Sequence, residues 1–266
     1  MIKERWAISG SHGFIGSHLV DKIIRDKEKD LALIGRYASF MRDTKVFIDC
    51  ASFGNLPSQF DISETYNANT LRAINLILQN HTVDYKAFVA ISTSSVGLPV
   101  QTYYSLSKKA TEAFAQQYAR DFDKPVVVVR PYSITGVGEQ SEHLIPKLID
   151  SCINGTRMKF VPDPVHDFLD IDDFVSGIFK VVDYAKDSPG AIFPIGSGKQ
   201  YSNQEVLDIV ERVTGKKANV EVVDNMRKYD TTEWVADLTM MSAIGWEPEK
   251  TLEQSITEMY EQRKNT

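Results

Sequence analysis

Two residues four positions apart, Tyr104 and Lys108, have the types and the spacing that acid–base chemistry needs. They begin a run of helical periodicity, and residues four apart on a helix share a face, so both side chains can reach one pocket. A free phenol has a pKa of about 10, and a nearby ammonium favours the phenolate. Such a tyrosine can exchange a proton with a hydroxyl group. An isolated pair with this spacing is more often a surface lysine beside a half-buried tyrosine, so the catalytic interpretation depends on the motifs that precede it in the chain.

Three glycines, Gly10, Gly13 and Gly16, predict a nucleotide site near the start of the chain. Residues 6–9 before them are typical of a short buried strand, and residues 15–24 carry apolar side chains at helical spacing. The glycines thus lie on a strand-to-helix turn, where a pyrophosphate can rest on backbone N–H groups at a helix N-terminus. Glycine is needed there because φ is positive or because a side chain would block the close approach.

The order of further motifs resembles that of the extended short-chain dehydrogenases/reductases, in the NAD-dependent epimerase/dehydratase group. Residues 46–52 are similar to the family's fourth strand, and residues 88–97 to the strand that supplies a catalytic Ser or Thr. The other matching segments are residues 69–76, 127–131, 166–173 and 245–248, with Asp237. Each match is weak alone, but their common order indicates the family.

The resemblance implies roles for individual residues. Tyr104 would be the acid/base, Lys108 would lower its pKa and hold the nicotinamide ribose, and Thr93 would hydrogen-bond the reacting oxygen. The cofactor-binding residues it implies are Gly10, Gly13, Phe14, Ile15, Gly16, Arg36, Ala51, Tyr104 and Lys108. The substrate-binding residues it implies are Thr93, Ser94, His166 and Arg227. No metal site is expected.

The reaction expected from the resemblance is that of an NAD(P)-dependent sugar-nucleotide epimerase or 4-keto reductase, acting on a nucleoside-diphosphate sugar. Dehydratases of the family carry an acidic pair after the catalytic threonine, whereas this chain has Ser94 and Ser95 there, so water elimination is not expected. A second hypothesis is an atypical NADP-binding relative that senses redox state with little turnover. The intact Thr93, Tyr104 and Lys108 favour the enzyme.

Departures from the family pattern bear on the cofactor and the pocket. The second strand ends in Gly35 and Arg36 instead of an acidic residue, and an arginine can pair with a 2′-phosphate, which favours NADP while NAD stays open. Only nine residues, 36–44, separate the second strand from the segment that resembles the family's fourth strand. The family's third strand and its helix, which help to hold the adenine, are therefore expected to be missing. A six-residue loop, 98–103, replaces a longer one, so we expect an open pocket that the C-terminal lobe and a second subunit of a homodimer close.

Alternating strands and helices predict an α/β fold, a Rossmann-like doubly wound parallel sheet with a smaller C-terminal substrate lobe. We expect the NAD(P)-binding domain to span residues 1–137, with 167–196 packing back on it. Residues 138–166 and 197–266 would form the substrate-binding lobe.

Composition excludes other classes of function. The net charge of −6 without a basic run argues against nucleic acid as a partner. No apolar stretch is long enough to cross a bilayer, and no signal peptide is recognisable, so we expect no membrane partner. The two cysteines, Cys50 and Cys152, suit a reducing compartment, and we expect a cytoplasmic protein.

Overall fold

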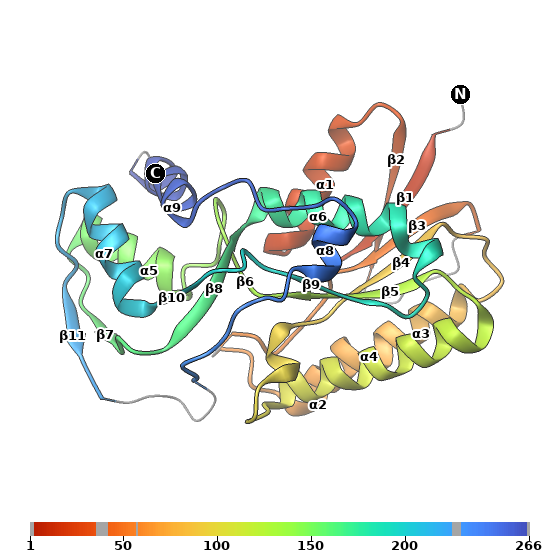
Figure 1. Cartoon of the computed structure of the whole chain (residues 1–266), viewed down its shortest axis with the longest axis horizontal. Helices are drawn as coiled ribbons and strands as arrows, with labels where there is room; N and C mark the ends of the chain where they lie inside the picture. The colour runs from red at the N-terminus through yellow and green to blue at the C-terminus, as the bar shows by residue number, and fades with distance from the viewer. Residues whose placement is uncertain (1–2, 36–41, 57, 225–229, 265–266) are drawn as a thin grey trace. The chain divides into compact units, whose positions relative to one another are not determined.

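Short apolar strands and amphipathic helices form a six-stranded parallel sheet in the computed structural model, which describes residues 3–35, 42–56, 58–224 and 230–264. The chain divides into two units: unit 1 holds residues 1–131, 175–195 and 240–246, and unit 2 holds residues 132–174, 196–239 and 247–266. The sheet belongs to unit 1 and has the order β2-β1-β3-β4-β5-β9 (Figure 1). Its strands are β1 (Glu4–Ser9), β2 (Lys29–Ile34), β3 (Thr44–Asp49), β4 (Ala87–Ile91), β5 (Val126–Pro131) and β9 (Ile192–Ile195).

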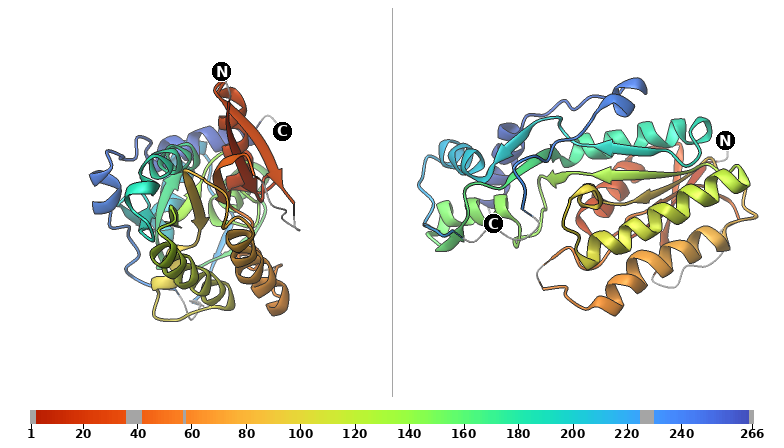
Figure 2. Two further views of the ribbon diagram at one scale, coloured as in Figure 1. Left: turned by 90° about the vertical axis from the view of Figure 1, so that its right-hand side faces the viewer. Right: turned by 60° about the horizontal axis from the view of Figure 1, so that its bottom comes forward.

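Helices cover both faces of this sheet, as side-chain alternation along β1 illustrates. Trp6 stacks on Phe179 of α6 with ring centroids 4.7 Å apart, whereas its neighbour Ala7 packs in a cluster with Leu76 and Tyr118 on the opposite face. One face carries α1 (Phe14–Arg25) and α6 (Ile171–Tyr184). The other carries α2 (Ile62–Tyr66), the π-helix η1 (Asn67–Leu71), α3 (Arg72–Gln79) and α4 (Tyr103–Phe122), and Figure 2 shows α3 beside α4. The predicted doubly wound parallel sheet is confirmed.

Burial on both faces explains why the strands are apolar throughout. Residues 126–129 of β5 are fully buried valines, as expected for a parallel strand between two helical layers. Unit 1 also contains the 3₁₀-helices η2 (Ser94–Gly97) and η3 (Ala185–Asp187), and most of α8 (Thr239–Ala243).

Strand β2 is an edge of the sheet, because among the described residues no strand pairs with its outer side. Residues 35–43 connect β2 to β3, and residues 36–41 of this connection lie outside the described part of the chain. In this order β1 pairs with β2 on one side and with β3 on the other. The loss of the family's third strand stays a prediction, because residues 36–41 lie outside the described part of the chain.

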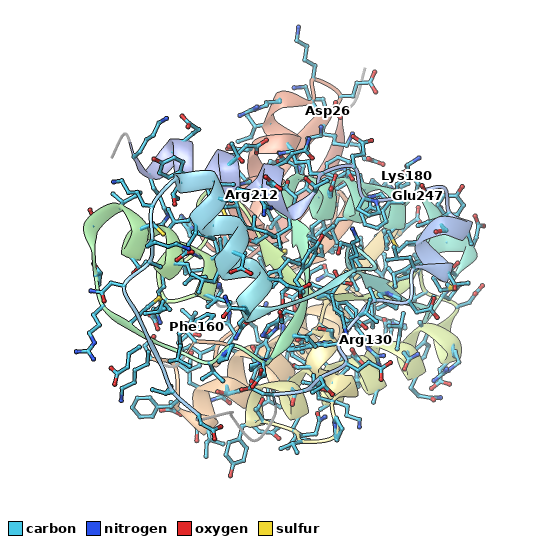
Figure 3. All side chains as sticks on the ribbon, turned by 60° about the vertical axis from the view of Figure 1, so that its left-hand side comes forward. Asp26, Arg130, Phe160, Lys180, Arg212 and Glu247 are labelled. Atoms are coloured by element: carbon cyan, nitrogen blue, oxygen red, sulfur yellow. The ribbon has the colours of Figure 1, made fainter. Side chains whose placement is uncertain are left out.

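Unit 2 has its own core between small sheets and three helices. The sheets are β10-β8-β6 and β11-β7, built from β6 (Ser133–Thr135), β7 (Met158–Phe160), β8 (Val165–Asp170), β10 (Gln200–Ser202) and β11 (Val220–Val222). Its helices are α5 (Leu144–Asn154), α7 (Asn203–Thr214) and α9 (Leu252–Arg263). Phe160, labelled in Figure 3, is almost completely buried in this core. None of the described helices has the length and apolarity needed to span a membrane.

Candidate active site

The turn between β1 and α1 is built around glycines that no other residue can replace. Gly10 has a φ of +66°, and a Cβ added to it would lie 2.7 Å from the backbone nitrogen of Ala51. A Cβ on Gly16 would lie 2.1 Å from the carbonyl oxygen of Gly10. Both separations are shorter than real Cβ contacts. A side chain on Gly10 would push the turn away from the segment after β3, and one on Gly16 would push α1 away from the start of the turn.

The N-terminus of α1 presents backbone donors without a side-chain cap. Gly13 is the N-cap residue, has no capping side chain, and is followed by a first turn without acidic residues. The first N–H groups of a helix have no intrahelical acceptor, and the helix dipole adds partial positive charge there. Together with the space that the missing Cβ atoms leave, residues 10–16 fit the pyrophosphate of a dinucleotide. Phe14, Ile15 and Gly16 supply this first turn.

A cavity of about 850 Å³ extends from the glycine turn within unit 1. Its walls are residues 10–13 of the turn, residues 33–35 at the end of β2, residues 51–53 after β3, and one side of the α2–η1–α3 run. The volume is typical of a cleft for a small molecule or cofactor. The predicted residues Gly10, Gly13 and Ala51 therefore line the same cavity.

A buried ion pair joins the ends of β1 and β3 to α3. Arg72 Nη2 lies 2.6 Å from Asp49 Oδ1, and the two side chains are 11% and 5% exposed. The Ser9 hydroxyl donates to the same carboxylate oxygen and accepts from the Ala51 N–H at 3.1 Å. Arg72 also donates to the carbonyl oxygens of Ala51, at 3.1 Å, and Ala68, at 3.0 Å. These bonds fix the segment after β3 against the start of the glycine turn.

Helix α4 brings Lys108 to the end of β4. The helix begins with a capping box between Thr102 and Ser105, which sets its start one residue before Tyr104. Lys108 is 4% exposed, and its Nζ donates to the carbonyl oxygen of Ile91 at 2.9 Å. Burial lowers the pKa of Lys108 from 10.5 to about 8, because desolvation disfavours the charged form, and the charge of Asp49 acts in the opposite direction.

Tyr104 lies one helical turn before Lys108 and contacts the segment after β3. Burial raises the pKa of Tyr104 to about 12, while a side-chain hydrogen bond with Ser52 acts to lower it. This direction is opposite to the one expected from the spacing of Tyr104 and Lys108. The physical reason is that desolvation of the phenolate dominates, and that the Lys108 ammonium is bound to Ile91.

Thr93 follows β4 by two residues and is the N-cap of η2. Its hydroxyl accepts from the Ser95 N–H at 3.2 Å and lies 3.0 Å from the Ser95 hydroxyl. Thr93 is half-buried, whereas Ser94 is 8% exposed within η2. Thr93 and Lys108 are thus both positioned at the end of β4, the former by η2 and the latter by α4.

Asn69 connects these elements through three hydrogen bonds. Its amide accepts from Phe53 N at 2.9 Å and donates to Phe53 O at 2.8 Å and to the Ser107 hydroxyl at 2.9 Å. Asn69 is buried within the π-helix η1, a form of helix often found at functional sites. It therefore holds the segment after β3 against the first turns of α4.

Three predicted residues are not among the described residues that form this site in unit 1. His166 belongs to β8 of unit 2, where its ring packs near Trp234 and its Nδ1 lies 3.4 Å from the Ser133 hydroxyl. Arg36 and Arg227 lie outside the described residues. Among the residues that are described, no group of three or more His, Cys, Asp and Glu side chains is placed to hold a metal ion.

Sequence reasoning missed Ser52, Asp49 and Arg72. Asp49 carried a usable signal, because a carboxylate at the end of an apolar strand needs a hydrogen-bonded or charged partner. The identity of that partner had no local signal, since Arg72 is 23 residues away in the chain. Ser52 carried no signal beyond its place after the strand.

Comparisons with known proteins found a matching family model and distantly related proteins. The model of the family described as "NAD dependent epimerase/dehydratase family" matches residues 6–196. The chain is 24% identical to the low-salt glycan biosynthesis protein Agl12 of Haloferax volcanii, over 89% of this chain and 79% of that protein. It is 21% identical to the uncharacterized UDP-glucose epimerase YtcB of Bacillus subtilis, over 94% of this chain and 95% of that protein.

Solved structures share the fold at low identity. MoeE5 in complex with UDP-glucuronic acid and NAD has a TM-score of 0.89 at 20% identity, covering 98% of this chain and 100% of that one. The UDP-glucuronic acid 4-epimerase of Bacillus cereus with UDP-glucuronic acid and NAD has a TM-score of 0.88 at 18% identity, covering 98% of this chain and 99% of that one.

Proposed function

Because the chain belongs to the NAD-dependent epimerase/dehydratase family, we propose that it catalyses reversible hydride transfer at a ring carbon of a nucleoside-diphosphate sugar, as a 4-epimerase or a 4-keto reductase. The coarse class, an enzyme of the sugar-nucleotide epimerase type, follows from the family model and from relatives named as epimerases. The finer reaction rests on this chain's own residues.

The observation that carries the proposal is the approach of Tyr104 to the segment after β3 and of Lys108 to the end of β4, since residues 51–53 after β3 also line the glycine cavity. Tyr104 bonds Ser52, a cavity residue, and Lys108 bonds Ile91. A nicotinamide bound here would supply the hydride transfer. A phenol with a pKa of about 12 is protonated at neutral pH and can donate its proton to an oxygen that becomes negative during reduction. In the oxidative direction the Lys108 ammonium is the group that would stabilise the phenolate.

The residues beside Thr93 favour epimerisation or reduction over dehydration. Ser94 and Ser95 stand where the family resemblance expects an acidic pair, and both belong to η2. The Ser95 hydroxyl lies 3.0 Å from that of Thr93, so it supports this threonine. A serine hydroxyl at neutral pH supplies neither the acid nor the base that removal of water needs.

The choice of cofactor and the substrate contacts complete the proposal. NAD is bound in the solved structures of MoeE5 and of the Bacillus cereus epimerase, which supports a nicotinamide dinucleotide for this chain. We propose that Arg36 adds a preference for the 2′-phosphate of NADP. His166 and Arg227 stay our candidates for contacts with the diphosphate of the sugar nucleotide.

A turnover screen tests the proposal. The purified chain is incubated with NAD or NADP and a panel of UDP-, GDP-, CDP- and dTDP-sugars, and with NADH or NADPH and the corresponding 4-keto sugars. An epimerase forms a new sugar nucleotide without net change in nicotinamide absorbance, whereas a reductase consumes reduced cofactor in equal amount. Tyr104→Phe should lower the rate of either signal by about 10²–10⁴. Tight dinucleotide binding without any turnover would refute the enzyme and favour a redox-sensing protein.

A further inference from the structure

One wall of the cavity comes from η1 and α3, and it offers one apolar and one polar side chain to a ligand. Leu71, at the end of η1, and Asn75, one turn later on α3, both line the cavity, and positions four apart share a helix face. Leu71 is 56% exposed although its side chain is apolar. Asn75 is also exposed, and its amide has no hydrogen-bond partner among the residues that the structure describes. An apolar surface beside an unused amide suits a flat ring with a polar edge.

The position of this wall fits the adenosine half of a dinucleotide. Tyr104, which marks the nicotinamide end, lies near Asn69, because Asn69 bonds Ser107 and the Ser107 hydroxyl donates to the Tyr104 carbonyl at 2.7 Å. A helix rises 1.5 Å per residue, so Asn75 lies roughly 9 Å along the axis from Asn69. The glycine turn, where the pyrophosphate fits, belongs to the same cavity.

In the described part of the chain, β2 is the outermost strand on this side of the cavity. Among the described residues no strand lies outside β2, and residues 33–35 at its end line the cavity with α3. A base in this place needs contacts from another element. Asn and Gln side chains can both donate to and accept from the edge of adenine, and apolar side chains pack on its face.

We propose that the adenine ring of the cofactor packs against Leu71 and is bound at its polar edge by the side-chain amide of Asn75. The η1–α3 run thereby provides base contacts beside β2, which is the edge strand among the described residues. The inference rests on the proposed function, since it presupposes a bound nicotinamide dinucleotide.

The test compares probes that contain the adenosine half with one that lacks it. Affinities for NADH, ADP-ribose and reduced nicotinamide mononucleotide are measured for the unmodified chain, Asn75→Leu and Leu71→Ser, by nicotinamide fluorescence and by displacement. Loss of one neutral hydrogen bond should weaken NADH and ADP-ribose about 2- to 10-fold in Asn75→Leu. Leu71→Ser should weaken both by a similar factor. The mononucleotide should bind all three proteins equally.

Gln117→Leu is the matched control, because it removes an exposed amide from α4 away from the cavity and should change no affinity. Unchanged NADH binding in Asn75→Leu and Leu71→Ser would overturn the inference. So would an equal loss for the mononucleotide, because the variants would then disturb the whole site. If the unmodified chain binds NADH but turns over no sugar nucleotide, the proposed function fails while the adenine assignment can still be confirmed. If it binds no probe, both fail.

Discussion

Replacing Lys108 by methionine should stabilise the fold at neutral pH while removing activity. The Lys108 ammonium is 4% exposed, and burial lowers its pKa from 10.5 to about 8. Each pKa unit corresponds to about 1.4 kcal/mol, so keeping the charge at pH 7 destabilises the folded state by about 3 kcal/mol. Methionine has a similar length but leaves the Ile91 carbonyl oxygen without a donor, at a cost of about 1–3 kcal/mol. The variant should therefore be more stable by up to about 2 kcal/mol at pH 7.

The pH dependence has a definite sign. Because the pKa of Lys108 is lower in the folded than in the unfolded chain, the unfolded chain binds more protons between pH 8 and 10.5. The free energy of unfolding of the unmodified protein therefore rises with pH across this window, and the destabilisation is complete below pH 8. About 2.5 kcal/mol is recovered by pH 10, whereas the methionine variant gains nothing from this site. At pH 10 the unmodified protein should be the more stable of the two.

Urea denaturation followed by circular dichroism at pH 7 and pH 10 measures this difference. Lys109→Met is the matched control, because Lys109 is exposed on the same helix and its replacement should give a difference independent of pH. Other groups that titrate in this range affect all three proteins equally and cancel. If the difference between the unmodified chain and Lys108→Met stays the same at both pH values, Lys108 does not titrate as a buried group and the reasoning is wrong.

Three further outcomes are expected. Tyr104→Phe should lower kcat by about 10²–10⁴ with little change in NADH affinity, as steady-state rates and nicotinamide fluorescence can measure; full activity would contradict its role. Arg36→Asp should reverse a preference for NADP over NAD, and added salt should narrow that preference in the unmodified chain; equal binding of both cofactors by the unmodified chain would remove the premise. Asp49→Asn should lower the free energy of unfolding by about 3 kcal/mol, because it leaves the Arg72 guanidinium buried without its carboxylate. Adding Arg72→Leu should restore part of that loss in the same urea titration, and a purely additive double variant would show that the two side chains do not interact.

The glycine turn could be predicted from the sequence because its requirement is local. Gly10 adopts a positive φ, and Gly16 cannot carry a Cβ because that atom would clash with the carbonyl oxygen of Gly10, six residues earlier. Tyr104 and Lys108 could be placed on one helix face for the same reason, since four-residue spacing fixes their direction. The parallel sheet followed from the repeated pattern of apolar strands and amphipathic helices, and the structure confirms it.

Electrostatic properties could not be predicted in this way. The spacing of Tyr104 and Lys108 indicated a lowered phenol pKa, but the degree of burial depends on what β3, β4 and η2 pack against α4. In the folded chain burial dominates for both groups, raising the pKa of Tyr104 and lowering that of Lys108. Both shifts favour the neutral forms. The spacing therefore determines which side chains share a helix face, while tertiary packing determines the pKa of each.

The ion pair of Asp49 and Arg72 illustrates how packing of distant segments supports a site made of local motifs. Two charges that are 5% and 11% exposed are stable in the fold because each is bound to the other. Arg72 is also bound to the carbonyl oxygens of Ala51 and Ala68, and Asp49 to the Ser9 hydroxyl. Asp49 also acts on Lys108, since its charge raises the lysine pKa that burial lowers, whereas Arg72 acts to lower it. The ion pair therefore holds the segment after β3 in place. Because the two charges act on the pKa of Lys108 in opposite directions, their combined effect on that pKa is smaller than the effect of Asp49 alone. A change in either residue should thus alter both the shape of the cavity and the protonation of the lysine at its end.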